Sequence, residues 1–219
     1  MAGQSGVCTS GVQRPGECLA LSPEEKDQVD GAPRGPEPPP RNVLTGVTRR
    51  EPDALREFFE HYLDTVHSLA FRLVGESLAE DVTQDVFFKV HRAAHRLDPE
   101  RDPRYWLNAI TYNTCREIWR SGAHKLEART VSIQDKPEVG ARLRESGRDP
   151  EMEYEVSSRE ASVQAAIESL PEPLRAAIVL HDYQGLGHEA VAEMTGISHV
   201  AARKRYSRAL AELAKKLRG

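Results

Sequence analysis

The sequence predicts an all-α protein with two small helical domains, a flexible linker between them and a disordered N-terminal extension. Three observations lead to this prediction. Apolar residues recur at three- and four-residue steps over residues 51–120 and again over 151–219, which is the spacing of one helix face. No stretch alternates apolar and polar residues with a period of two, so we expect no strand. Proline and glycine gather in residues 1–50, and residues 121–150 are highly charged and weakly periodic.

The first segment, residues 1–50, is expected to form no core. It holds seven of the 14 prolines, and its six acidic and six basic side chains leave few apolar ones to bury. Cys8 and Cys18 lie here, and with Cys115 they make three cysteines, an odd number that argues against a disulfide framework. The N-terminus lacks a basic segment followed by an apolar one, so we expect a cytoplasmic protein.

Residues 51–120 are expected to form a first domain of three helices. The first runs from about residue 55 to 73 and ends near Gly75. The second covers 76–97, where Asp98 and Pro99 stop it, and the third begins near Pro103, a residue that suits the first turn of a helix.

Residues 121–150 are expected to be the linker, and 151–219 a second helical domain. Its last two helices, 187–196 and 198–217, are separated by a short turn at Gly196, with Ser198 as N-cap and small Ala192 at the crossing. This order is typical of a helix-turn-helix. The inward face of the last helix is predicted to consist of Tyr206, Leu210, Leu213 and Leu217.

The last 21 residues carry seven Lys or Arg and a single acid, Glu212, although the whole chain has a formal net charge of −4. Cationic side chains on an exposed helix can meet phosphates and guanine edges. Because local charge rather than net charge draws a helix to DNA, the pattern favours DNA binding over a merely solvated basic face. The acidic surplus lies mainly in residues 51–120, which indicates a second, protein partner.

Two stretches resemble a known family. The run from "AEDVTQDVFFKVHRA" (79–93) to "YWLNAITYNTCREIWR" (105–120) is similar to the promoter-melting domain, region 2, of bacterial RNA polymerase sigma factors. The run "LPEPLRAAIVLHDYQGLGHEAVAEMTGISHVAARKRYSRALAEL" (170–213) resembles region 4 of the same family. With only a linker between them, the chain looks like the compact extracytoplasmic-function (ECF) class.

The resemblance implies a sigma factor that binds core RNA polymerase, recognises the −35 and −10 promoter elements and melts the −10 region. Its implied partners are the β′ clamp helices and β flap of core polymerase, promoter DNA and an anti-sigma factor, without membrane insertion. The surface for core polymerase would comprise Asp81, Gln84, Asp85 and Phe88. The −10 element would be held by Arg101, Arg104, Tyr105, Asn108, Tyr112, Asn113, Arg116 and Arg120, and the −35 element by Ser198, His199, Arg203, Lys204, Arg205, Ser207 and Arg208.

The sequence departs from the family pattern in three places, one of which is the 50-residue N-terminal extension, absent from the usual compact form. Val200-Ala201-Ala202 stands where a Gly-Thr-Val-like step is usual, so the preferred −35 sequence is not carried over from the family. His91 stands where a tryptophan is frequent.

Other classes of function are open on the residues alone. His91 and His95 have the spacing of a zinc-binding pair, but no glutamate follows the first histidine and no third ligand is evident, so we expect no metal. We expect no other cofactor and no catalysis by this chain. The alternatives are a helix-turn-helix regulator that is not a sigma factor, and a pure protein-interaction module, which would lack the basic helix.

Overall fold

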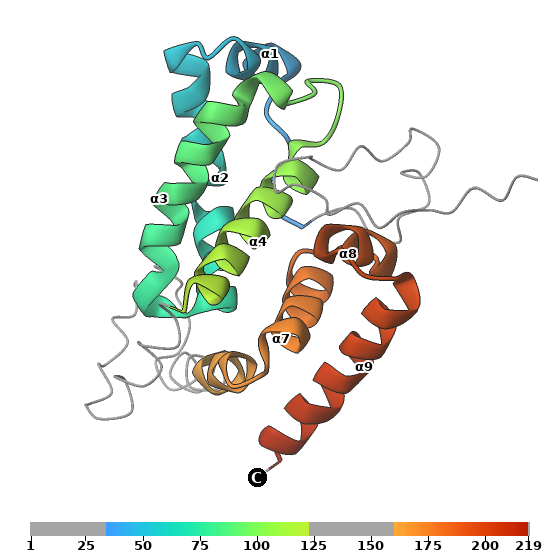
Figure 1. The fold of residues 1–219 in the computed structure, drawn as a ribbon. Coiled ribbons are helices and arrows are strands. Elements are labelled where there is room, and N and C mark those ends of the chain that lie inside the picture. The colour runs from blue at the N-terminus through green and yellow to red at the C-terminus, as the bar shows by residue number, and fades with distance from the viewer. Residues whose placement is uncertain (1–33, 123–159, 219) are drawn as a thin grey trace, which may run out of the picture.

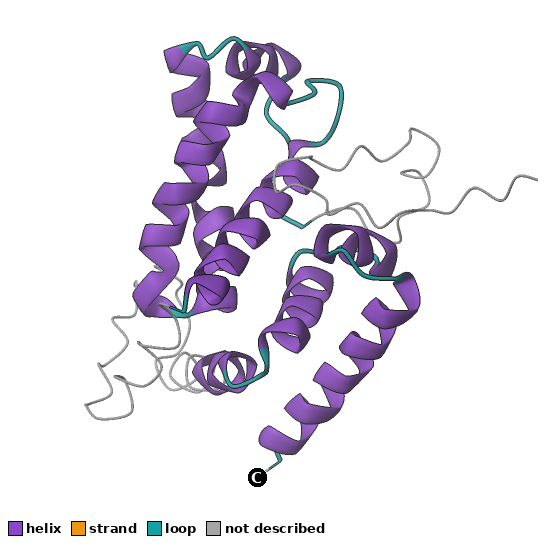
Figure 2. Cartoon of the chain, in the orientation of Figure 1, coloured by secondary structure: helices purple, strands orange, loops and turns teal. Residues whose placement is uncertain are grey.

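The computed structural model describes residues 34–122 and 160–218, and within these ranges the regular elements are all helices (Figures 1 and 2). The fold class predicted from the sequence is therefore confirmed. None of the described helices is long and apolar enough to cross a membrane. The predicted linker lies almost wholly outside the described residues.

The first group of helices, which we call the N-terminal bundle, is built on three long helices that pack side by side (Figure 1). A short helix, α1, lies across one end of them. The elements are α1 (Arg41–Thr48), α2 (Pro52–Val74), α3 (Glu76–Ala93), the 3-10 turn η2 (Ala94–Arg96) and α4 (Pro103–Ser121). The apolar positions that predicted each long helix form the core, which includes Phe58, Val82 and Leu107.

The helix ends follow from local chemistry. Gly75 has a φ of 85°, a left-handed value that other residues rarely adopt, and it turns the chain sharply from α2 into α3. At α4, Asp102 is the N-cap and its carboxylate accepts from Arg104 N at 2.9 Å, while Pro103 occupies the first turn. Both ends agree with the sequence prediction.

The prediction that residues 1–50 form no core is wrong for residues 41–48. Helix α1 buries Val43, Leu44 and Val47 against α2 and η2. The proline-rich composition just before it concealed an amphipathic helix of two turns. Gly46 is needed at the contact, because a Cβ there would lie 2.6 Å from Ala54 Cβ.

The second group, which we call the C-terminal unit, begins with a helix over residues 160–168. It continues with α7 (Glu172–Ile178), the π-helical turn η4 (Val179–Tyr183), α8 (His188–Thr195) and α9 (His199–Lys216). Helices α7 and α8 both pack on α9. Gly196, with a φ of 71°, ends α8, and Ala192 and Ala202 are buried in the crossing, as the helix-turn-helix prediction required.

The predicted inward face of α9 is wrong in its C-terminal half. Leu210 is 44% exposed and Leu217 is 50% exposed, whereas Ala202 and Ala209 are the residues of α9 that are buried. The cause is length: the 18-residue helix packs on a seven-residue and an eight-residue helix and extends beyond them (Figure 1).

The two groups of helices pack together, and arginines make much of the joint. Arg175 of α7 is 6% exposed and donates to the carbonyl of Leu73, near the end of α2, at 2.7 Å. Arg72 of α2 lies over the ring of Tyr183 in η4, with its guanidinium carbon 3.8 Å from the ring centroid. Gln164 donates to the carbonyl of Phe71 at 3.3 Å. We call this packing the closed arrangement.

Replacing Leu44 by alanine should lower the free energy of unfolding, because it leaves a cavity between α1 and the bundle. Buried leucine-to-alanine changes lower it by about 2–5 kcal/mol. Chemical denaturation followed by circular dichroism measures the change. The exposed neighbour Asn42, replaced in the same way, is the control and should change stability by less than about 0.5 kcal/mol. Equal values for the two variants would show that α1 does not contribute to the core.

Candidate nucleic-acid interface

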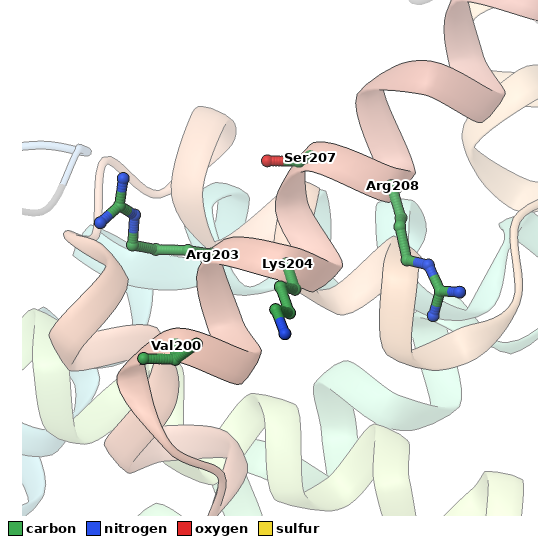
Figure 3. A pocket seen from close by; sticks show the side chains of 5 residues that line it. All are labelled: Val200, Arg203, Lys204, Ser207 and Arg208. Carbon is green, nitrogen blue, oxygen red and sulfur yellow. The ribbon is translucent and has the colours of Figure 1, made fainter.

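A basic hollow lies on the first half of α9. Ser198 caps the helix by accepting from Ala201 N at 3.3 Å, which fixes where the helix starts. From there, Val200, Arg203, Lys204, Ser207 and Arg208 line a hollow of about 670 Å³ (Figure 3). Their spacing of three and four residues places them on one helix face. Three cations around one open hollow form a surface suited to an anion such as a phosphate backbone.

The structure divides the predicted −35 set. Arg203, Lys204, Ser207 and Arg208 lie together at the hollow. The other three lie outside that lining. His199 is exposed at the start of the helix, and Arg205 is half-buried, close enough to α4 for its charge to act on Tyr112.

Val200 was missing from the set predicted from the sequence. Its side chain is 61% exposed and lies at the edge of the hollow (Figure 3). The signal was present in the sequence, because residues 200, 203, 204, 207 and 208 share one helical face. Reasoning from charge alone passed over an apolar residue.

A cluster of rings fixes α9 against η4 and α8. The rings of His181 and His188 are stacked at 4.4 Å, and Tyr206 of α9 lies 4.3 Å from His181. The Tyr206 hydroxyl donates to Asp182 Oδ1 at 2.9 Å, and His181 Nδ1 lies 2.8 Å from the same oxygen. Burial lowers the pKa of His188, and the charges of His181, Arg203 and His199 lower it further.

The predicted −10 residues on and before α4 are not equally accessible. Arg101 and Arg120 are exposed, and Tyr105, Asn113 and Arg116 are half-buried. Asn108 is 2% exposed and Tyr112 is 6% exposed. Burial raises the pKa of Tyr112, against the opposing charges of Arg116, Arg205 and Arg120. The participation of Arg205 shows that α9 comes close to this face of α4.

Arg104 is engaged on two sides. Its Nε lies 2.8 Å from Asp102 Oδ2, and Nη2 donates to the same carboxylate, which raises the pKa of Arg104. Its Nη1 lies 3.5 Å from the carbonyl of Gly35. The guanidinium is thus held by Asp102 and by the backbone at Gly35.

The acidic face of α3 is open. Asp81, Gln84, Asp85 and Phe88 are all exposed, and Phe88 is 63% exposed. Gln84 and Asp85 are each three or four residues from both Asp81 and Phe88, so the four form one stripe. An exposed aromatic ring amid carboxylates is the composition expected of a protein-binding surface.

Within residues 34–122 and 160–218, no group of three or more potential ligands is placed to hold a metal ion. The buried Cys115 is a free thiol whose pKa burial raises to about 12, so it is a packing residue of α4.

Comparison with known proteins identifies the family. A sigma-70 region 2 family model matches residues 58–125, and a sigma-70 region 4 model matches residues 160–213. The chain is 30% identical over 153 residues to RNA polymerase sigma factor SigZ of Bacillus subtilis, which covers 69% of this chain and 79% of that protein. It is 34% identical over 159 residues to the ECF sigma factor SigE of Mycolicibacterium smegmatis, covering 72% of this chain and 59% of that protein. The chain belongs to the ECF sigma factors.

The sigma factor therefore directs promoter-specific transcription. The region 2 match covers α2 to α4, so the alternative of a helix-turn-helix regulator outside this family is not favoured.

Two solved structures share the fold. One is CnrH in complex with the cytosolic domain of CnrY, with a TM-score of 0.55 at 21% identity, covering 81% of this chain and 96% of that one. The other is RpoE of Bartonella quintana in complex with the anti-sigma factor NepR, with a TM-score of 0.56 at 19% identity, covering 74% and 96%.

The imidazole of His188 should titrate below its usual value of 6.5 in the folded sigma factor. Between its folded pKa and 6.5 the unfolded chain binds more protons, so stability falls as the pH falls through that window. NMR titration of the histidine ring signals measures the pKa directly. Replacing His188 by asparagine should flatten this part of the stability profile, and the same change at the exposed His67 is the control. A His188 pKa at or above 6.5 would contradict the expectation.

Proposed function

We propose that this sigma factor reads the −35 element with the basic hollow of α9. The observation that carries the proposal is that Arg203, Lys204 and Arg208 line one exposed hollow. The first turns of a recognition helix commonly meet base edges and later ones the backbone, so Arg203 is assigned to a base and Arg208 to a phosphate. Val200 lies at the same edge and would contact an apolar group such as a thymine methyl.

The −10 element is proposed to meet the loop before α4 and α4 itself. Arg101, Arg116 and Arg120 would neutralise phosphates, and Tyr105 would stack on an unpaired base, a contact worth roughly 1–3 kcal/mol. Asn108 and Tyr112 belong to the same face but are buried in the closed arrangement. Their use requires that these two side chains become exposed first.

Core RNA polymerase is proposed to bind the stripe of Asp81, Gln84, Asp85 and Phe88, through the β′ clamp helices. The exposure of all four side chains supports this assignment. The C-terminal unit would meet the β flap. This chain would itself carry out no reaction, and it would work in the cytoplasm, where polymerase and promoter DNA are found.

An anti-sigma factor is proposed as a further partner. The related fold of RpoE was solved in complex with the anti-sigma factor NepR, and it aligns with 74% of this chain. Such a partner would control when the surfaces of α3, α4 and α9 become available.

Replacing Phe88 by alanine should weaken binding to core polymerase by about 2 kcal/mol, roughly thirtyfold, as expected for an aromatic residue at the centre of an interface. Reversing Asp81 and Asp85 to lysine should also weaken it. Affinity measured with purified core enzyme is the readout. Leu63→Ala is the matched control, because Leu63 is an exposed apolar residue of α2 outside the stripe. If Phe88→Ala binds as tightly as Leu63→Ala, the stripe is not the docking surface.

Replacing Arg208 by alanine should weaken binding to all −35 sequences alike and reduce the salt dependence of binding by a slope of about one. Replacing Arg203 should cost about 1–3 kcal/mol and relax preference at one position. A library of −35 variants, tested with the polymerase holoenzyme at two salt concentrations, separates the two roles. Lys215, an exposed cation near the end of the same helix, is the control. If Lys215→Ala weakens binding as much as Arg208→Ala does, the hollow is not a specific DNA contact and α9 is only a generally basic surface.

A further inference from the structure

A short proline-rich segment, residues 34–40, connects the N-terminal bundle to the C-terminal unit. It leads into α1 and passes α4 on its way (Figure 1, blue). We call it the strap. Residues 36 and 38–40 are all prolines, which fix φ and favour an extended backbone.

One part of the strap lies on the N-terminal bundle. The Glu37 carbonyl accepts from His61 Nε2 of α2 at 2.7 Å, and Pro39 is buried. Gly35 has a φ of 130°, and a Cβ there would lie 3.6 Å from Thr65. The carbonyl of Gly35 lies 3.5 Å from Nη1 of Arg104.

The other end lies on the C-terminal unit. Arg34 N donates to the carbonyl of Gln184 at 2.7 Å, and the Arg34 guanidinium donates to the carbonyl of Asp182. Both acceptors lie at the end of η4, where helix carbonyls have no partner further along the helix and carry the negative end of the helix dipole. Arg34 therefore caps a helix of the C-terminal unit from a segment anchored on the bundle.

The anchoring makes this contact effective. Helix α1 is fixed in the bundle core by Val43, Leu44 and Val47, so the strap starts from a defined point. Six extended residue steps span roughly 19 Å at ~3.1 Å each. Because the prolines already restrict the free segment, little conformational freedom is lost when Arg34 reaches η4.

We propose that the strap is an intramolecular fastener that holds the C-terminal unit against the N-terminal bundle and keeps the sigma factor closed. The strap itself engages Arg104 through the carbonyl of Gly35, and the closed arrangement brings Arg205 of α9 toward Tyr112; Arg104 and Tyr112 are both assigned above to the −10 element. The strap is therefore autoinhibitory, and this consequence, unlike the closure itself, rests on the proposed function.

The test is single-molecule energy transfer between dyes on Ser77→Cys of α3 and Ala211→Cys of α9, two exposed positions, in a chain with Cys8 and Cys18 replaced by serine. Two truncations are compared. Removal of residues 1–33 keeps the strap, and removal of residues 1–40 takes the strap but keeps α1. Two point variants of the full chain accompany them: Arg34→Ala, and Glu37→Gln as a control in the same segment.

The shorter truncation and Glu37→Gln should keep the energy transfer of the full chain. The longer truncation should shift the population to low transfer, and Arg34→Ala, which loses a charged hydrogen bond, should lower the closed-to-open ratio by about tenfold. Unchanged transfer after removal of residues 1–40 overturns the proposal. Equal opening by both truncations also overturns it, because residues ahead of the strap would then be responsible. If the longer truncation loses its helical circular dichroism, the full-length Arg34→Ala variant is the test instead, and unchanged energy transfer in that variant overturns the proposal.

Binding of a single-stranded −10 oligonucleotide is measured in parallel. Under autoinhibition, the longer truncation should bind more tightly than the shorter one. If energy transfer shows opening but neither form binds the oligonucleotide, the strap stands and the −10 assignment fails. If both bind equally despite opening, the strap closes the molecule but the autoinhibitory part of the proposal is overturned.

Discussion

The guanidinium of Arg175 is the interaction on which the closed arrangement depends. A charge so deeply buried needs acceptors for its donors, and both Nη groups of Arg175 have them, whereas its Nε has none. Here the acceptors are backbone carbonyls: Leu73 of α2 at 2.7 Å, Leu170 at 3.1 Å, and Glu168. Burial lowers the pKa of Arg175, which shows the desolvation that these bonds must offset. Because Leu73 belongs to the other group of helices, separating the two would leave Arg175 without one of its close acceptors until water replaced it.

Arg34 and Arg175 make the same kind of contact from opposite sides of the joint between the two groups of helices. Each donates to the free carbonyls at the end of a helix in the other group, Arg34 at η4 and Arg175 at α2. Helix C-termini offer such acceptors without any specialised side chain. Arg72 adds a third contact through the ring of Tyr183. These polar contacts accompany apolar packing, because one cluster of buried apolar residues, which includes Leu73 of α2 and Val179 of η4, extends across both groups of helices.

Much of the fold could be predicted from the sequence because long helices repeat their pattern. Helices α2, α3 and α4 each present several turns of buried residues, and Gly75, Pro103 and Ser198 mark ends by local chemistry alone. Helix α1 was missed because eight residues give only two turns of pattern beside a proline run. The apolar residues of α9 do lie on one side of the helix, yet Leu210 and Leu217 stay exposed. Periodicity shows which side of a helix could be buried, whereas burial depends on how far its neighbours extend.

Only part of the candidate site could be predicted from the sequence, for a related reason. Charge and spacing located the hollow of α9 and the stripe of α3, because all residues of each surface belong to a single helix. They could not show that Asn108 and Tyr112 are buried, or that Arg104 contacts Gly35, since burial and this contact depend on residues far apart in the chain. The strap itself was hidden for the same reason, as its partners at residues 182 and 184 lie about 150 positions away.

The difference between exposed and engaged surfaces has a thermodynamic consequence for how the sigma factor would open. A partner shifts an equilibrium between two conformations only by its difference in affinity for them. The stripe with Phe88 and the hollow with Arg208 are exposed in the closed arrangement. Binding confined to those two surfaces would therefore be equally strong in both states and would not open the protein. Opening has to be driven by contacts that only the open form offers, and on the proposed assignment these are contacts to Arg104 and Tyr112, which lie beside the strap and α9. The unpaired −10 strand, or a polymerase surface that takes the place of the C-terminal unit beside α2, is then the partner that releases the strap.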